Sequence, residues 1–216
     1  MKGVIFDWDG VVIDSSAQHE RSWELLAAEE EKPLPKGHFK AGFGKKNQEI
    51  IPKLLKWTDD PDEIARLGDR KEVLYREIVR EQGVTVLPGA RELLGALAEA
   101  GIPRSVGSST PRSNLDAIFA ATGLGGLFTA VVCGDDVKNG KPAPDVFLLA
   151  AEKLGLAPED CLVIEDAHVG IAAAHAAGMN VLAVATTHPL AELTDADAAV
   201  ATLAGITPAK LQRITG

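Results

Sequence analysis

From residue 84 onward the chain alternates short apolar runs with amphipathic segments, and this alternation restricts the fold more than any other feature. The apolar runs lie at 104–108, 129–136, 161–166 and 180–186. The segments with helical periodicity begin after Pro88-Gly89 and lie at 112–121, 144–155 and 169–178. Strands separated by helices of about 10–15 residues form βαβ units with a parallel sheet. We therefore predict an α/β fold with a Rossmann-like, three-layer core built on a parallel sheet.

Residues 15–83 follow a different pattern. They contain helical-period segments near 17–31, 47–57 and 61–81, and no convincing strand. The segment comes directly after the first apolar run, Val4-Ile5-Phe6. We therefore expect a small α-helical cap domain at 15–83, inserted after the first strand, and a core domain formed by 1–14 and 84–216.

Composition excludes several classes of protein. The 216 residues suffice for one domain with an insertion, and the formal net charge of -9 gives no basic face for a nucleic acid. No apolar run approaches the ~20 residues that cross a bilayer, and the start has no signal-peptide pattern. We expect a cytoplasmic monomer that acts on neither nucleic acid nor membrane. Cys133 and Cys161 lack C-x-x-C spacing, so we expect buried, reduced thiols.

Polar side chains stand at the carboxyl ends of the predicted strands. Open α/β sheets bind ligands in the crevice outside these ends. The residues placed there are Asp7, Asp9, Ser108, Ser109, Asp135, Asp136, Glu165 and Asp166, with Lys141 following in "NGKPAPD". One edge of the sheet is therefore expected to gather carboxylates, hydroxyls and a lysine.

So many carboxylates in one cleft need a counter-charge. Mg²⁺ is suited to this set, because it takes one or two carboxylates, water and a substrate phosphate. Lys141 adds a fixed positive charge, and the Ser108 hydroxyl can hold an oxyanion. These parts suit phosphoryl transfer, where catalysis is mainly positioning and charge neutralisation. Asp7 and Asp9 face one side in an extended chain, so one can be the nucleophile and the other the proton donor.

Four short motifs resemble those of the haloacid dehalogenase superfamily. "FDWDGVVIDS" is similar to the first motif, "VGSS" to the second, "GKPAPDVF" to the lysine motif and "VIEDAHVGIAAAHAAG" to the acidic motif. Each is weak alone, but the four in this order are specific. The helical insertion resembles the cap of the subgroup that contains β-phosphoglucomutase and small phosphosugar phosphatases.

The resemblance implies a role for each matched residue. Asp7 would attack phosphorus and ligate Mg²⁺. Asp9 would protonate the leaving group and then activate water, with its backbone carbonyl on the metal. Ser108, with Ser109 beside it, would bind the transferring phosphoryl group, and Lys141 would bridge that group and Asp7. Asp166 would ligate Mg²⁺, with Glu165 as a ligand or an acceptor behind it.

Each of these residues also has a structural reading. The two aspartates could form a solvated strand-end turn, the serines and the Glu165-Asp166 pair could cap helices, and Lys141 could be a solvated loop residue. For Asp135 and Asp136 we favour a turn and helix-cap role.

The cap offers candidates for holding the non-reacting part of the substrate. They are His19, Lys45, Lys46, Asn47 and Lys71. Lys71 lies in a charged helix, "DRKEVLYRE", and Lys45 and Lys46 follow a glycine-rich turn, so solvent exposure is an equally good reading for these lysines.

The resemblance leaves more than one activity open. We expect a Mg²⁺-dependent phosphatase that acts on a small phosphorylated metabolite through an aspartyl-phosphate intermediate. A sugar phosphate is the favoured substrate. The alternative is a phosphosugar mutase of the β-phosphoglucomutase type; the cap loop has lysines where the mutase has an arginine nearby, which weakens this reading. Three other functions are less favoured. A dehalogenase of the superfamily would need neither Asp9 nor a metal, and a phosphonate hydrolase would need a cap lysine that forms a Schiff base. A non-enzymatic binding protein would have lost catalytic residues.

Overall fold

The computed structural model describes residues 1–42 and 45–214. The chain divides into two compact units. One unit combines Met1–Asp14 with Thr85–Gly216, and the other is Ser15–Val84. The second boundary lies one residue later than the sequence predicts.

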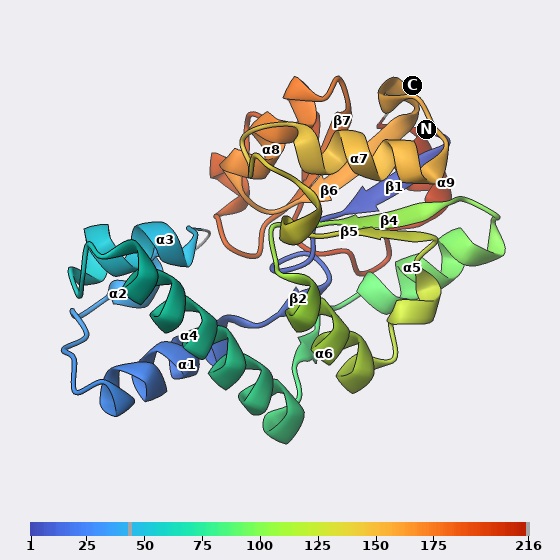
Figure 1. The fold of residues 1–216 in the computed structure, drawn as a ribbon. Coiled ribbons are helices and arrows are strands. Elements are labelled where there is room, and N and C mark those ends of the chain that lie inside the picture. Colours follow the sequence, from blue (N-terminus) through green and yellow to red (C-terminus); the bar gives the residue numbers. More distant parts are fainter. Residues whose placement is uncertain (43–44, 215–216) are drawn as a thin grey trace. The chain divides into compact units, whose positions relative to one another are not determined.

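A six-stranded parallel sheet forms the centre of the first unit, in the order β5-β4-β1-β6-β7-β8 (Figure 1). The strands are β1 (Gly3–Phe6), β4 (Arg104–Gly107), β5 (Ala130–Val132), β6 (Cys161–Glu165), β7 (Asn180–Val184) and β8 (Ala198–Val200). The predicted α/β fold and its parallel sheet are confirmed. The strand β8 is an addition, because two alanines and one valine give only a weak apolar signal.

A short antiparallel pair, β2 (Ile13–Asp14) and β3 (Thr85–Val86), was not expected from the sequence. It joins the two points where the chain leaves and re-enters the first unit. Two residues per strand are too few for a period-2 pattern to be read.

Helices cover both faces of the sheet, with α7 and α8 on one face and α5 and α6 on the other (Figure 1). The helices of this unit are α5 (Ala90–Glu99), α6 (Arg112–Thr122), α7 (Asp145–Leu154), α8 (His168–Ala176) and α9 (Pro208–Gln212). Gly123 and Gly155 follow α6 and α7 with φ of 69°, the left-handed conformation that ends a helix and that glycine adopts without strain.

Both faces of β1 are buried, and this burial holds the backbone that leads into Asp7. Ile5 packs into the apolar core that includes Phe147 of α7. Phe6 contacts the ring of Phe128 edge-on at 6.1 Å between centroids. Trp8 is fully buried against Phe119 of α6, at 5.1 Å. The backbone on both sides of Asp7 is therefore anchored by large apolar side chains, each worth roughly 1.5–3 kcal/mol when buried.

Within its described residues, 15–42 and 45–84, the regular elements of the second unit are all helices, joined by loops. Its elements are α1 (Ser16–Glu29), α2 (His38–Gly42), α3 (Asn47–Glu49), a π-helical turn (Ile50–Leu55) and α4 (Pro61–Gln82). Leu26, Ile51 and Leu67 are fully buried in its apolar core. Exposed ion pairs also join α1 to α4, but such pairs contribute only about 0–1 kcal/mol each, so the apolar core holds the unit together.

The single helix expected at 47–57 is wrong in detail. The chain forms three residues of α3 and then a π-helical turn that ends at Lys56, with φ of 55°. Pro52 lies inside this turn and has no N–H to donate, so the regular α-helical hydrogen-bond pattern cannot pass through it.

Cys133 and Cys161 are buried free thiols, as predicted. In the part of the chain that the structure describes, no helix has the length and apolar character needed to span a membrane.

Candidate active site

Three carboxylates meet at the carboxyl ends of β1 and β6. These strands are neighbours, and the Asp7 amide donates to the carbonyl of Ile164 at 2.9 Å. Asp7, Glu165 and Asp166 each present a carboxylate oxygen, and the three oxygens lie within 4.8 Å of one another. The crevice expected from strand order is therefore the place where the acidic side chains collect.

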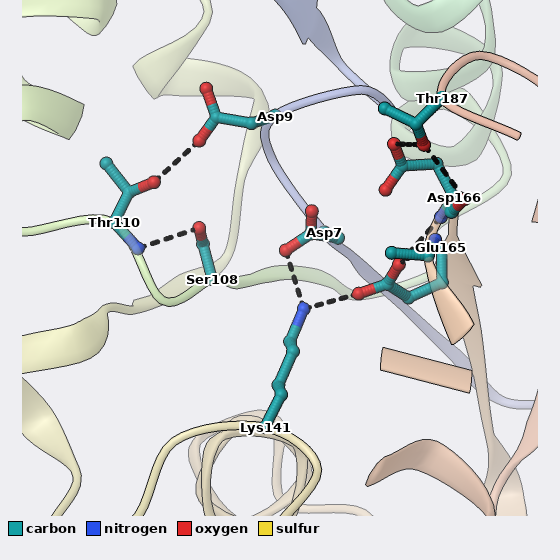
Figure 2. Close-up of polar contacts among 9 residues, drawn as sticks. Asp7, Asp9, Ser108, Thr110, Lys141, Glu165, Asp166 and Thr187 are labelled. Carbon is teal, nitrogen blue, oxygen red and sulfur yellow. Dashed lines mark hydrogen bonds and ion pairs between the residues drawn. The ribbon is translucent and has the colours of Figure 1, made fainter. Parts of the chain in front are cut away.

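Lys141 brings the one ammonium group that Figure 2 draws among these carboxylates. Its Nζ donates to Asp7 Oδ1 at 2.7 Å and to Glu165 Oε1 at 2.6 Å. The side chain is 7% exposed and its Nζ lies 4.6 Å from the Phe147 ring centroid. The solvated-loop reading of Lys141 is therefore wrong.

With its three carboxyls ionised and Lys141 protonated, this cluster carries a net negative charge. Burial raises the pKa of Asp7 to about 7, and the charges of Glu165 and Asp9 add to the rise, although Lys141 opposes it. Burial, followed by the charges of Glu165 and Asp7, raises the pKa of Asp166 well above its usual range. Burial opposes the charge of Lys141, but Asp7 and Glu165 outweigh it and raise the pKa of Lys141. One ammonium group does not compensate three carboxylates.

Glu165 is held at the start of α8. Its Oε2 accepts from the backbone amides of Asp166 at 2.7 Å and Ala167 at 2.8 Å. Gly170 makes room for it, because a Cβ there would lie 1.7 Å from Oε1. These amides precede α8, whose N-cap is Ala167 without a side-chain cap hydrogen bond, so the helix-capping reading is wrong for Glu165, and its Oε1 belongs to the acidic cluster.

Asp166 is held by Thr187, which the sequence analysis missed, and lies close to Gly10. Thr187 donates its hydroxyl to Asp166 Oδ2 and, at 3.0 Å, to the Asp166 carbonyl (Figure 2). Gly10 has φ of 80°, and a Cβ there would lie 1.9 Å from Asp166 Oδ2. The position of Thr187, three residues after the apolar run of β7, was the available signal, since it stands at the same edge of the sheet.

Asp9 lies apart from the acidic cluster. Figure 2 shows its side chain turned toward Thr110, whose hydroxyl donates to Asp9 Oδ2 at 2.6 Å. The Thr110 amide also donates to Ser108 Oγ at 3.1 Å. Ser108 is 2% exposed, whereas Ser109 is exposed. Thr110 was missed by the sequence analysis although it directly follows the "SS" pair.

Asp135 and Asp136 serve the structure, as expected. Asp135 accepts from the Arg112 amide at the start of α6, at 2.8 Å. Asp136 accepts from the Arg112 side chain and from the Cys133 amide.

In the helical unit, three of the candidate residues lie in one polar cluster. Lys71 Nζ lies 2.7 Å from His19 Nδ1 and 3.0 Å from Glu72 Oε1. Asn47 donates to the same Glu72 oxygen at 2.8 Å. The His19 ring stacks on Tyr75 with 4.0 Å between centroids. Glu72 was not predicted; it adjoins Lys71 in the charged helix.

The candidate lysines of this unit differ in solvent exposure. Lys71 is 3% exposed, so the solvent-exposed reading is wrong for it. Lys45 and Lys46 are exposed, and part of the turn before them, Phe43 and Gly44, lies outside the described residues.

The acidic cluster fits a hard divalent cation. Its donor set is three carboxylate oxygens, the ligand type that Mg²⁺ prefers. Burial first, and neighbouring negative charge second, raise the pKa values of Asp7 and Asp166, and a bound cation would lower them. Asp7, Asp166 and Glu165 Oε1 are the groups that could hold it, with the Asp9 side chain directed elsewhere.

Similar proteins are known. The family model of the haloacid dehalogenase-like hydrolases matches residues 1–178 of this chain. The chloroplastic 5-amino-6-(5-phospho-D-ribitylamino)uracil phosphatase of Arabidopsis thaliana is 35% identical over 92% of this chain, which spans only 53% of that relative. Hexitol phosphatase A of Escherichia coli is 33% identical over 97% of this chain and 94% of its own length.

A mutase and a solved structure are also similar. Beta-phosphoglucomutase of Bacillus subtilis is 31% identical over 88% of this chain and 86% of its own. The crystal structure of a HAD hydrolase, family IA, variant 3, from Entamoeba histolytica has a TM-score of 0.90 at 27% identity, covering 100% of this chain and 99% of that one.

Proposed function

The chain belongs to the haloacid dehalogenase-like hydrolases, as its four motifs predict, and on that premise we propose that it is a Mg²⁺-dependent phosphatase. Its substrate class is a small phosphorylated metabolite with a sugar or sugar-like polyol as the leaving group. The names of the hexitol phosphatase and of the ribitylaminouracil phosphatase support this class. The observation that carries the proposal is the bridge of Lys141 between Asp7 and Glu165 beside a carboxylate cluster.

The proposed reaction has two steps. Asp7 attacks phosphorus, the bond from phosphorus to the leaving oxygen breaks, and Asp9 gives its proton to that oxygen, releasing an alcohol. A water molecule then attacks phosphorus, Asp9 takes its proton, and the bond from Asp7 to phosphorus breaks to release phosphate. Lys141 and Ser108 hold the phosphoryl oxygens, and both groups are buried and already positioned.

Bound Mg²⁺ would neutralise charge on the phosphoryl group and on Asp7. Asp7 and Asp166 are the proposed ligands from side chains, and the Asp9 carbonyl is the proposed ligand from the backbone. Glu165 would stand behind them, because its carboxylate already accepts two amide hydrogen bonds and the Lys141 ammonium.

The mutase is the second candidate, favoured by the similarity to the Bacillus subtilis enzyme. The difference is whether water or a second substrate hydroxyl attacks the aspartyl-phosphate. A mutase also has to hold a second phosphate. In the helical unit the buried cation Lys71 has its charge paired with Glu72, which supports a hydrolase instead.

Phosphate release from a panel of phosphometabolites with Mg²⁺ tests the proposal. We expect release from sugar or polyol phosphates by the wild type, loss of release with EDTA, and loss with Asp7→Asn. Undiminished release by Asp7→Asn would exclude the mechanism. Glucose 1-phosphate, with and without a bisphosphate activator, separates the two candidates, because only a mutase would form glucose 6-phosphate without free phosphate.

A further inference from the structure

Thr110 makes two hydrogen bonds that connect two parts of the site. Its hydroxyl donates to Asp9 Oδ2 at 2.6 Å, and its amide donates to Ser108 Oγ at 3.1 Å (Figure 2). Asp9 follows β1, while Ser108 and Thr110 follow the neighbouring strand β4. A single residue thus contacts both the proposed proton donor and a proposed phosphoryl-binding hydroxyl.

The directions of these two hydrogen bonds indicate the roles of the Asp9 and Ser108 oxygen atoms. A threonine hydroxyl has one hydrogen, and Thr110 gives it to Asp9 Oδ2. Oδ2 is then an acceptor, which favours Oδ1 as the atom that carries the proton when Asp9 is protonated. Ser108 Oγ accepts from the Thr110 amide, which leaves its own hydrogen to donate to a phosphoryl oxygen.

We propose that Thr110 is a positioning residue for proton transfer by Asp9. It holds the Asp9 carboxyl with Oδ1 as the proton-carrying atom while the bond from phosphorus to the leaving oxygen breaks. This inference rests on the proposed phosphatase activity. The β-methyl group of threonine restricts its χ1, so the hydroxyl is held in direction better than a serine hydroxyl would be.

The proposal makes the role of Thr110 depend on the leaving group. A basic leaving oxygen needs the Asp9 proton as its bond to phosphorus breaks, whereas p-nitrophenolate is stable enough to depart with little help. Phenyl phosphate and p-nitrophenyl phosphate are therefore suitable probes, because they differ in leaving-group basicity and little in shape. The ratio of their kcat/KM values reports the step up to departure of the phenol, and it does not depend on the fraction of enzyme that is folded.

The experiment compares Thr110→Val with Thr110→Ser and with Thr122→Val. Thr122 is a matched control, since its hydroxyl donates to the Ile118 carbonyl within α6 and accepts from the Leu124 amide after it. We expect Thr110→Val to lower kcat/KM for phenyl phosphate about tenfold more than for p-nitrophenyl phosphate, part of the 10²–10⁴-fold typical of proton transfer. Thr110→Ser should restore most of the ratio, and Thr122→Val should keep the wild-type ratio.

Two results would overturn the inference. Equal losses on both probes in Thr110→Val would mean that the residue serves folding or phosphate binding only. A Thr110→Ser variant as deficient in the ratio as Thr110→Val would exclude the hydroxyl as the cause. Failure of the phosphatase proposal looks different, because the wild type itself would then release no phosphate from either probe in the presence of Mg²⁺.

Discussion

Lys141 Nζ lies 2.7 Å from Asp7 Oδ1, although the two residues are 134 positions apart in the chain. The same Nζ lies 2.6 Å from Glu165 Oε1, so the lysine holds two carboxylates that would otherwise repel each other. Breaking a buried ion pair from one side typically costs 3–5 kcal/mol, unless the remaining group neutralises by taking up a proton. The lysine therefore keeps the proposed nucleophile both in place and closer to ionisation.

Replacing Lys141 by methionine should lower phosphatase kcat by about 10²-fold or more, the loss typical when one stabilising donor is removed from a reaction centre. Asp7 would lose its bridging partner, and the phosphoryl group would lose a cation. Lys138→Met is the control, since Lys138 is an exposed residue earlier in the same loop. Steady-state rates on the best substrate of the panel measure the effect. A Lys141→Met variant as active as Lys138→Met would contradict the assigned role.

The contribution of Asp7 to the stability of the metal-free protein should fall as pH rises from about 4 to about 7. Burial raises the pKa of Asp7 to about 7, so the folded state holds this proton more tightly than the unfolded chain does. The free energy of unfolding then decreases with pH between the unfolded and the folded pKa values. Asp7→Asn removes this cost and should be more stable than the wild type at pH 8, by at most about 4 kcal/mol.

Urea unfolding in EDTA at several pH values tests this expectation. The advantage of Asp7→Asn should shrink toward pH 4, where the wild-type carboxyl is protonated in the folded state. It should also shrink when Mg²⁺ is added at pH 8, because only the wild type keeps its full ligand set. An advantage that is constant from pH 4 to pH 8 would show that Asp7 titrates normally.

Mg²⁺ binding should release protons and weaken as pH falls below about 7. The metal needs ionised carboxylates, and the pKa values of both Asp7 and Asp166 are raised, first by burial. Affinity should therefore decrease by up to about tenfold for each pH unit and each proton displaced. Calorimetry in two buffers with different ionisation enthalpies counts the protons. Release of none at pH 6 would mean that these carboxyls are not the ligands.

Most of the fold was predictable from the sequence because its signals are local. Apolar runs such as Cys161–Glu165 and glycine stops such as Gly155 mark the strands and helices directly. The meeting of Asp7 with Glu165 also followed, because carboxyl ends of adjacent parallel strands share an edge. The π-helical turn and the two-residue strands β2 and β3 depend on single residues or on pairing partners, which periodicity does not reveal.

The missed site residues share a different cause. Thr110, Thr187 and Glu72 each make a hydrogen bond to a side chain that is distant in sequence. Threonine and glutamate are common on surfaces, so their type carries no signal until the partner is placed. The contrast between Lys71 and Lys45 has the same origin, since only the packing of α4 buries the first.

Two glycine-to-alanine changes on helices should have opposite effects on stability. Alanine is better than glycine in a helix by about 1 kcal/mol, so Gly95→Ala in α5, with open space at its Cβ, should stabilise by roughly 0.5–1 kcal/mol. In Gly170→Ala the new Cβ would lie 1.7 Å from Glu165 Oε1, which accepts a hydrogen bond from Lys141 Nζ. Overpacking of this kind costs about 1–3 kcal/mol and here also displaces a charged pair, so the helix gain is outweighed.

Urea unfolding and phosphatase assays on both glycine variants separate the helix effect from the site effect. We expect Gly170→Ala to lose at least about 1 kcal/mol and most of its activity, while Gly95→Ala keeps its activity. A double variant, Gly170→Ala with Glu165→Ala, probes the cause: without the Glu165 side chain the overlap is gone, so the two losses should be less than additive. Strict additivity, or a Gly170→Ala protein as stable as Gly95→Ala, would mean that Glu165 can move away without cost. The close approach of α8 to the acidic cluster would then contribute nothing to holding Lys141 between its two carboxylates.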